Sequence, residues 1–406
     1  MGERTRKAGA REEETKLVAA PLSPPAPPGR DELLRALGVE PHEIASVAEL
    51  DGGLSGAHIQ RLTLRSEAPG AAAAYRQRVV KWLAPERGWL GAASRDTAMR
   101  EARLWASGVL ADLPHTVATA VLAAAERDHD TPARAAVLLM RDVSSWLLRD
   151  PTRTPPGQLP PSVLGIVDGM ARTHARFWED ARLDDPALGL TPPVAALLLA
   201  APDTIRARIE TSGDTNPYLP LAMAGWDAFF RLASSNDAET LRAVLRAPEP
   251  WLAAITRLPR TLLHGDVWGP NLGFLPPTRI APQRGRRVLL LDWALAAPGP
   301  APYDPLWLCG TWHALSPPRV LAAYRARLAR HLSARRIQLA PQTWRVLVDA
   351  AYLRTALTCG EALGRAAHDA PPGAARRRAQ QRVHWWARRA AAAAHRLRPA
   401  DDAASS

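Results

Sequence analysis

Two short apolar runs, each followed by polar residues, constrain the fold of this chain more than any other feature. The segment 261–274, TLLHGDVWGPNLGF, leads from two leucines into a loop that carries Asp266 and Asn271. The segment 288–294, VLLLDWA, delivers Asp292 in the same way. Oxygen-bearing side chains presented from strand ends can hold divalent cations and orient a hydroxyl nucleophile. The sequence therefore points to phosphoryl-transfer chemistry.

Length and composition indicate an ordinary globular protein. The chain has 406 residues, 47% of them hydrophobic and 23% charged, which suits two or three domains or lobes. No apolar run approaches the roughly 18 residues of a membrane span, and residues 1–16 lack the apolar core of a signal peptide. We expect a cytoplasmic protein with no membrane partner. The two cysteines, Cys309 and Cys359, predict neither a disulfide framework nor a thiolate metal site.

The formal net charge of +12 comes mainly from arginine and raises the question of a nucleic-acid partner. The arginines are scattered along the sequence, so nucleic acid is the less favoured partner, with the basic helix expected at 376–398 as its contact. A basic surface attracts nucleotides and anionic substrates and repels polycations at long range. The charge pattern leaves the oligomeric state open.

Residues 31–140 have the pattern of a small sheet lobe. A proline-rich segment, residues 1–30, precedes it and predicts a disordered arm. A helix is expected at 94–110, after the third strand. Apolar runs with strand-like alternation predict five strands, at 44–50, 59–64, 76–83, 115–124 and 133–140.

The turn between the first two strands reads DGGLSGAH. Backbone N–H groups of a glycine-rich turn can lie over phosphates, and a serine hydroxyl can join them. Glycine-rich turns connect many strands, so this one gains weight from its place before the strand that carries Lys81. The candidate nucleotide-binding residues of the turn are Gly52, Gly53, Ser55 and Gly56.

Residues 141–398 change to a helical period and predict a larger, mainly helical lobe. Apolar residues recur at helical spacing from 163 to 178, which predicts a buried face with His174 as a core histidine. The last residues, 399–406, predict a solvated tail. Further helices are expected at 305–315, 319–332, 341–363 and 374–398.

The order of these motifs resembles that of the aminoglycoside phosphotransferase and choline kinase-like family, small-molecule kinases with the protein-kinase fold. HGDVWGPN at 264–271 resembles the family's catalytic loop, H-G-D-x-x-x-x-N, and LLLDWA at 289–294 resembles its metal-binding strand end. ARTHARFW at 171–178 is similar to a helix that commonly precedes the catalytic loop. The resemblance covers roughly residues 45–313 and implies a bilobal α+β fold with a five-stranded antiparallel N-lobe and a mainly helical C-lobe.

The resemblance also implies an activity, the transfer of the γ-phosphate of ATP to a hydroxyl of a small molecule with the help of Mg²⁺. Asp266 would accept or orient the proton of the acceptor hydroxyl. Asn271 and Asp292 would supply hard oxygen ligands for Mg²⁺. The alternative to a catalytic role is that Asp266 and Asn271 only stabilise a turn.

Lys81 is a candidate phosphate-binding residue for an independent reason. Lysine occurs only at positions 7, 16 and 81, among dozens of arginines. A compact ammonium fits between phosphate oxygens in a way that a forked guanidinium does not. Glu101, on the expected helix, is the favoured ion-pair partner of Lys81, and Glu86, in an expected loop, is the less favoured one.

Four further residues near the site take their predicted roles from the resemblance. His264 would organise the catalytic loop by hydrogen bonding, and Asp304 would also hold that loop. Met140 and Asp142 belong to the crossing between the lobes, where backbone groups would meet the adenine edge.

Two departures from the family pattern have consequences. Gly265 stands where protein kinases usually have arginine, which predicts activity that is not coupled to a phosphorylated loop. Ala294 stands where an acidic residue or glycine is frequent, so one possible carboxylate ligand for metal is missing.

The acceptor is predicted least directly. Four tryptophans lie close to the motifs and can line an acceptor pocket or pack in the core, namely Trp268, Trp293, Trp307 and Trp312. The sequence shows no strongly acidic acceptor site, which favours a neutral, hydroxylated small molecule. The alternative to an active kinase is a catalytically weak, nucleotide-binding pseudokinase or scaffold.

Overall fold

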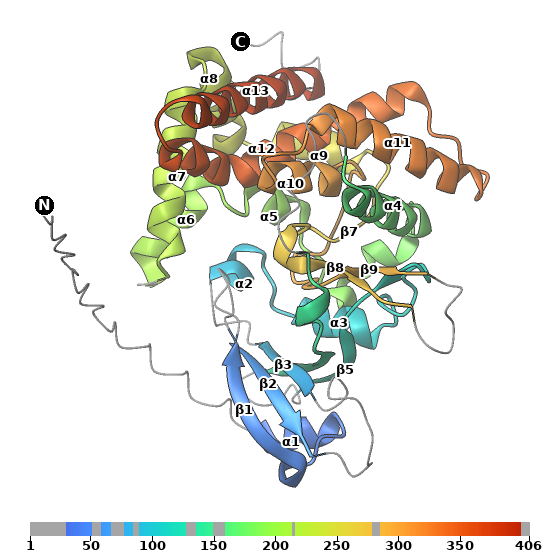
Figure 1. Ribbon diagram of the computed structural model, residues 1–406. Helices are drawn as coiled ribbons and strands as arrows, with labels where there is room; N and C mark the ends of the chain where they lie inside the picture. Colours follow the sequence, from blue (N-terminus) through green and yellow to red (C-terminus); the bar gives the residue numbers. More distant parts are fainter. Residues whose placement is uncertain are drawn as a thin grey trace, which may run out of the picture.

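The computed structural model describes residues 30–50, 58–65, 77–83, 89–126, 135–148, 159–212, 216–277 and 285–398. Figure 1 shows a smaller sheet lobe, in blue and cyan, below a larger helical lobe. The predicted fold class is confirmed: an antiparallel five-stranded sheet accompanies a mainly helical second part. Several predictions lie outside the described residues, namely the arm at 1–29, the tail at 399–406, Glu86, and Gly52, Gly53, Ser55 and Gly56 of the glycine-rich turn.

The five-stranded sheet has the order β1-β2-β3-β6-β5, and every neighbouring pair is antiparallel. Two helices cover it, α1 (Arg30–Ala36) on one face and α3 (Arg100–Ala106) on the other. The strands are β1 (Ile44–Leu50), β2 (His58–Leu64), β3 (Gln77–Leu83), β5 (Val121–Glu126) and β6 (Ala136–Arg141).

Alternation along β3 decides which way Lys81 faces. Val80 and Trp82 pack in the cluster that contains the α1 leucines. Lys81 lies between them in sequence, so its side chain points to the other face of the sheet. Its cross-strand partner is Leu138, which packs with α3. Because side chains alternate between the two faces of a strand, Lys81 points toward α3, the helix that carries Glu101.

Two predicted elements of the N-lobe are corrected by the structure. The single strand expected at 115–124 is two strands, because β4 (Val117–Ala118) pairs in parallel with β9 of the other lobe while β5 stays in the N-lobe sheet. The single helix expected at 94–110 is also shorter. Only α3 (Arg100–Ala106) lies within it, because left-handed backbone at Arg95 and Met99, both with φ of 54°, separates α3 from a short preceding helix, α2 (Trp89–Ala93).

The helical lobe is built around α12 (Pro341–Asp369), which packs against α7 (Tyr218–Leu232), α10 (Tyr303–Thr311) and α13 (Ala374–Leu397). The buried face predicted near 163–178 lies mainly on α4 (Pro161–Arg176). The other helices are α5 (Pro193–Leu198), α6 (Pro202–Ser212), α8 (Ser235–Arg246), α9 (Glu249–Thr256) and α11 (Pro317–Ser333).

Short strands at the base of the helical lobe present the predicted catalytic loop. β7 (Thr261–Leu263) pairs with β10 (Ala297–Gly299), while β8 (Leu272–Leu275) and β9 (Arg287–Leu290) form a hairpin. Within the described residues no single helix is long and apolar enough to span a membrane, and one pair of segments bent by 104°, 186–198 with 202–210, meets the length and composition criteria together.

Candidate active site

The loop after β7 is held by a buried carboxylate. Asp304, at the start of α10, accepts hydrogen bonds from the backbone N–H of His264 (2.8 Å) and of Gly265 (3.1 Å). His174 Nε2 lies 3.1 Å from the same carboxylate, and Tyr324 bonds the other ring nitrogen. Burial raises the pKa of Asp304, but the hydrogen bond and the electrostatic effect of His174 lower it, so that the pKa lies below its usual range. Asp304 therefore lies where the sequence prediction required it, against the catalytic loop.

Gly265 is required by packing as well as by backbone conformation. Its φ is +83°, and a Cβ atom at this position would lie 2.1 Å from the carbonyl oxygen of Leu295. An arginine cannot occupy this position without moving the segment after Asp292. The absence of arginine at position 265 thus has a steric cause, in addition to the regulatory meaning that the sequence suggests.

Asp266 and Asn271 face each other across the loop. Asn271 Nδ2 donates to Asp266 Oδ2 (2.9 Å) and to the Asp266 carbonyl oxygen (3.1 Å). This leaves Oδ1 of both side chains for other partners. Burial and the nearby Asp292 charge raise the pKa of Asp266 to about 7, although the hydrogen bond from Asn271 lowers it. A carboxyl group with this pKa can take up a proton near neutral pH.

His264 is fully engaged in holding the loop. Its Nε2 lies 2.8 Å from the carbonyl oxygen of Leu291, and its Nδ1 accepts the N–H of Asp266 at 3.2 Å. A backbone carbonyl can only accept, so Nε2 carries the proton and the ring is neutral. Burial also lowers the pKa of His264. The ring connects the two predicted motifs, because Leu291 directly precedes Asp292.

Lys81 lies between two carboxylates. Its Nζ donates to Glu101 Oε2 at 2.9 Å and to Asp292 Oδ1 at 2.8 Å. Burial disfavours the charged lysine, but Asp292 and Glu101 raise the pKa of Lys81 well above its usual range. Burial raises the pKa of Glu101, whereas Lys81 lowers that of Asp292 against the effect of burial. The favoured pairing of Lys81 with Glu101 is present.

A buried arginine next to Glu101 ties the lobes together. The Arg100 side chain is completely buried. Its guanidinium donates to three backbone carbonyls, those of Ser94, Gly189 and Ala294. Ala294 follows Asp292 by two residues, and Gly189 belongs to the helical lobe. Arg100 therefore couples the position of α3, and hence of Glu101, to the backbone that carries Asp292.

The donor atoms suit a magnesium ion that is shared with phosphate. Asn271 keeps an amide oxygen free of hydrogen bonds to Asp266, and both Lys81 and Ala294 N–H bond to Oδ1 of Asp292, leaving Oδ2. Among the residues that the structure describes, no group of three or more His, Cys, Asp or Glu side chains forms a metal site. Two hard oxygen ligands, completed by water and phosphate, are typical of Mg²⁺.

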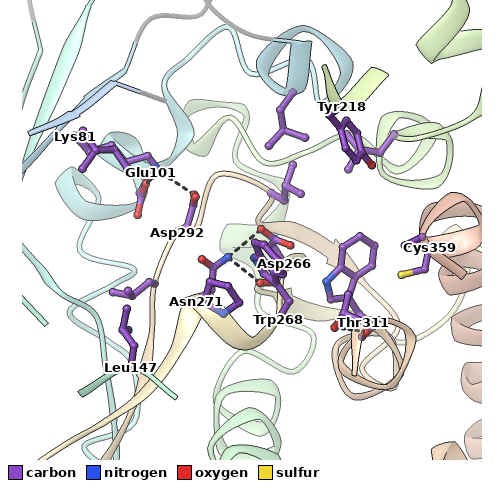
Figure 2. Close-up of a pocket in the computed structure, with 18 of the residues that line it drawn as sticks. Lys81, Glu101, Leu147, Tyr218, Asp266, Trp268, Asn271, Asp292, Thr311 and Cys359 are labelled. Atoms are coloured by element: carbon purple, nitrogen blue, oxygen red, sulfur yellow. Dashed lines mark hydrogen bonds and ion pairs between the residues drawn. The ribbon is translucent and has the colours of Figure 1, made fainter. Parts of the chain in front are cut away.

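One cavity of about 660 Å³ between the lobes is lined by Lys81, Glu101, Asp266, Asn271 and Asp292. In Figure 2 Lys81, Glu101 and Asp292 lie on one side of Asp266, and Tyr218, Thr311 and Cys359 lie on the other. The predicted adenine-edge residues Met140 and Asp142 line the first side. Other side chains there are apolar, as a planar base requires, and include Ile59, Val79, Val143, Leu147 and Leu291.

The side chain of Asp142 has a structural task of its own. Arg61 of β2 donates to its Oδ2 at 2.8 Å, and Ser144 N–H and Oγ–H bond to its Oδ1. Although burial opposes it, Ser144 and Arg61 lower the pKa of Asp142. The carboxylate therefore fixes the crossing between the lobes, and its backbone is what can meet a nucleotide.

The four predicted acceptor-pocket tryptophans separate into two groups. Trp268 and Trp307 line the cavity. Trp293 is completely buried with its ring 4.6 Å from that of His264, so its predicted place in an acceptor pocket is wrong. Trp312 is absent from the cavity wall that the structure describes and packs beside Gly269, where a Cβ would lie 2.9 Å from its indole nitrogen. Packing next to the loop accounts for both exceptions.

Sequence reasoning missed most of the acceptor side. Trp89 of α2 stacks on Tyr218 of α7 with ring centroids 5.1 Å apart, and Glu361 of α12 accepts a hydrogen bond from Tyr218. All three line the cavity. The only sequence signal was an acidic residue, Glu361, in an otherwise small and apolar stretch of α12.

A comparison with known families bears directly on the motifs. The model of the phosphotransferase enzyme family matches residues 194–338, which include the catalytic loop, Asp292 and Asp304. The resemblance predicted from the sequence is confirmed. So is the prediction of a phosphotransferase enzyme of the small-molecule kinase type. No curated protein matches the chain.

Several solved structures are similar to this chain. A choline kinase from Streptococcus pneumoniae is 15% identical, covers 88% of this chain and 97% of its own, and has a TM-score of 0.42. A choline kinase from Cryptosporidium parvum is 10% identical, with coverages of 88% and 89% and a TM-score of 0.44. A macrolide 2′-phosphotransferase from Brachybacterium faecium is 16% identical, with coverages of 82% and 94% and a TM-score of 0.37.

Proposed function

We propose that this protein uses ATP and Mg²⁺ to phosphorylate a hydroxyl group of a small molecule. The observation that carries the proposal is the position of Asp266 in the middle of one cavity. On one side of it lies the Lys81 cluster, and on the other lies a wall of aromatic and apolar side chains. Such a cavity suits a nucleotide and an acceptor that meet at Asp266.

The Lys81 side of the cavity would hold the nucleotide. The apolar side chains around Met140 and Leu147 would enclose the base, and the Lys81 ammonium would bind phosphate oxygens. Glu101 keeps that ammonium in place through the 2.9 Å ion pair. Asn271 and Asp292 would hold Mg²⁺, which when bound neutralises charge on the phosphate oxygens.

Asp266 would act on the acceptor hydroxyl. Because Asn271 bonds to Oδ2, Oδ1 is the oxygen left to accept the hydroxyl proton. The acceptor oxygen forms a bond to the γ-phosphorus, the bond from that phosphorus to the bridging oxygen breaks, and ADP leaves. The proton of the hydroxyl passes to Asp266, whose pKa of about 7 suits it to take up and release a proton near neutral pH.

The two alternatives fit the observations less well. A pseudokinase would be expected to lack one of the catalytic side chains, whereas Lys81, Asp266, Asn271 and Asp292 are all in the cavity. A nucleic-acid surface on α13 would need free arginines. Arg382 and Arg396 of that helix bond to backbone carbonyls and to Asp349, while its other arginines include exposed ones. A contact through those exposed arginines would leave the buried Lys81 cluster and the cavity without a role.

The test is an ATP-consumption screen with Mg²⁺ against hydroxylated antibiotics, sugars, amino alcohols and nucleosides, with the product identified by mass. Asp266→Asn is the control, and we expect it to lower kcat by about a thousandfold, the range that general-base residues contribute. Full activity of Asp266→Asn would contradict the role of Asp266. Nucleotide binding without turnover on any compound would favour the pseudokinase alternative.

A further inference from the structure

The far wall of the cavity is one face of α12. Side chains at helical spacing line it, and they are mostly small or apolar apart from Glu361, Arg365 and, near the end of the helix, the exposed Asp369. Glu361 is only 5% exposed. Burying a carboxylate beside apolar groups is costly unless its oxygens find partners, so the partners of Glu361 indicate what this part of the cavity binds.

Glu361 is held in place by a close helix crossing. A Cβ at Gly225 of α7 would lie 2.2 Å from the carbonyl oxygen of Glu361, so the two helices approach backbone to backbone. The crossing brings Tyr218 to Glu361, and the Tyr218 hydroxyl donates to Oε1 at 2.8 Å. Oε2 has no hydrogen-bond partner among the described residues. A buried, rigidly placed acceptor atom beside the cavity points to a ligand that donates a hydrogen bond.

Arg365 determines the charge that such a ligand can carry. Its Nη2 lies 3.6 Å from Oε2 of Glu361, one helical turn away, and its guanidinium lies 5.6 Å from the Tyr218 ring. The positive charge of Arg365 offsets the negative charge of Glu361. An ammonium group placed at Oε2 would also lie close to this guanidinium and be repelled. A neutral hydroxyl meets no such penalty.

The other polar groups on this side are neutral, except for the exposed Asp369 one turn beyond Arg365. Thr311 and Thr358 offer hydroxyls, and desolvation and the charge of Arg382 lower the pKa of His313, which disfavours its charged ring. The remaining surface comes from apolar side chains such as Leu90, Leu199, Trp268 and Ala362. This surface matches the body of an apolar molecule rather than that of a polycation.

We propose that the acceptor is an uncharged, apolar-bodied molecule with at least two hydroxyl groups. One hydroxyl meets Asp266, a second donates to Oε2 of Glu361, and Arg365 excludes amines from that second position. The inference rests on the proposed function, because it takes Asp266 as the place of phosphoryl transfer. It adds the class of acceptor and names Arg365 as the residue that sets its charge.

Binding can be measured without turnover from the fluorescence of the tryptophans that line the cavity. The probes for the full chain are hexyl glucoside, hexyl glucosaminide with its amine protonated, and glucose, which lacks the apolar chain. We expect hexyl glucoside to bind at least about tenfold more tightly than either of the other two. Equal or tighter binding of the amine, or no binding of hexyl glucoside at millimolar concentration, would overturn the proposal.

Variants of Arg365 test the charge argument itself. Arg365→Ala should raise the affinity for hexyl glucosaminide relative to hexyl glucoside by about tenfold, while Arg365→Lys should preserve the wild-type ratio. Arg345→Ala, an exposed arginine on the same helix, is the matched control and should also preserve it. If Arg365→Ala leaves the ratio unchanged, Arg365 does not select against amines and the proposal fails.

Phosphorylation of the same probes separates this inference from the proposed function. Selective binding of hexyl glucoside with no phosphorylated product would count against the kinase assignment and leave the binding preference standing. Phosphorylation of hexyl glucosaminide in preference to hexyl glucoside would keep the kinase assignment and overturn the acceptor class.

Discussion

The two halves of the cavity are built in different ways. On the proposed nucleotide side, Lys81 lies within 2.9 Å of both Glu101 and Asp292, and Arg100, next to Glu101, bonds to the backbone carbonyl of Ala294. On the proposed acceptor side, most of the surface is apolar, and the buried Glu361 pairs with the partly buried Arg365 at the longer distance of 3.6 Å, with the exposed Asp369 one turn further along α12. One side of the cavity is thus defined by charged side chains at short distances, and the other by a mainly apolar surface.

This difference suggests that the charged side carries out phosphoryl transfer and that the apolar side selects the acceptor. Phosphoryl transfer depends on a few atoms at fixed distances, and those atoms come from short motifs on β3, α3, the loop after β7 and the end of β9. We expect acceptor binding to depend on the contour of the surface that α2, α7, α10 and α12 form in the cavity. Variants on the nucleotide side should therefore affect every acceptor equally, whereas variants on the acceptor side should not.

Removing Lys81 should have the largest effect. In Lys81→Met the buried Glu101 and the partly exposed Asp292 lose their shared partner, so we expect the free energy of unfolding to fall by about 3 kcal/mol. We expect kcat/KM for ATP to fall by roughly a thousandfold with every acceptor. Denaturant titration and steady-state kinetics measure the two quantities. The double variant Lys81→Met with Glu101→Gln should regain part of the stability, and equal stability of the wild type and Lys81→Met would contradict a buried ion-pair cluster.

Replacing Arg100 should have the next largest effect, because Arg100 positions other residues but is not among the described residues that line the cavity. Arg100→Lys cannot reach three carbonyls at once, so Glu101 and Asp292 lose a common anchor. We expect kcat to fall by about tenfold and the KM for ATP to rise, while the KM for the acceptor stays the same. Arg103→Lys on the same helix, where the side chain pairs with Glu126 at the surface, is the control. An equal change in both KM values would indicate general loosening of the fold instead.

The pH dependence should separate Asp266 from the rest of the site. Since its carboxylate is the form that accepts a proton, kcat should fall about tenfold per unit as the pH drops below about 7. Between its unfolded pKa and about 7, the folded protein holds a proton that the unfolded chain releases, so this group stabilises the fold at low pH and that contribution is lost as the pH rises through 7.

Asp266→Asn offers a stability measurement of the same shift. At pH 8 it should raise the free energy of unfolding by roughly 2 kcal/mol, because a buried charge is removed, and the difference from wild type should vanish near pH 4. Thermal unfolding at the two pH values measures this. Equal destabilisation of Asp266→Asn at pH 8 and pH 4 would show that burial of the Asp266 charge does not destabilise the fold.

The smallest effect is expected on the acceptor side. Trp268→Leu keeps an apolar side chain but removes the flat ring, so we expect the KM of the acceptor to rise about fivefold with no change in the KM for ATP. Trp312→Leu, beside the loop but away from the cavity wall, is the control for general effects of losing a tryptophan. An increase in the KM for ATP in Trp268→Leu would mean that the two halves are not independent.

Local geometry explains how the motif residues that the sequence singled out come together. Alternation along β3 places Lys81 opposite Val80 and Trp82, and the helical period places Glu101 on the buried side of α3. The spacing of Asp266 and Asn271 allows a direct hydrogen bond within one loop. These relations span few residues, so the allowed backbone geometries leave little choice.

What the sequence alone determined was therefore the fold class, through the order of motifs that carries the family resemblance, and the short motifs that place Lys81, Asp266, Asn271 and Asp292 in one cavity. Tertiary structure decided which tryptophans face the cavity, where the strand at 115–124 divides between two sheets, and that Tyr218 meets Glu361. The last contact joins residues that are 143 positions apart through a helix crossing set by Gly225. No local pattern encodes such a crossing, because it depends on how whole helices pack against one another.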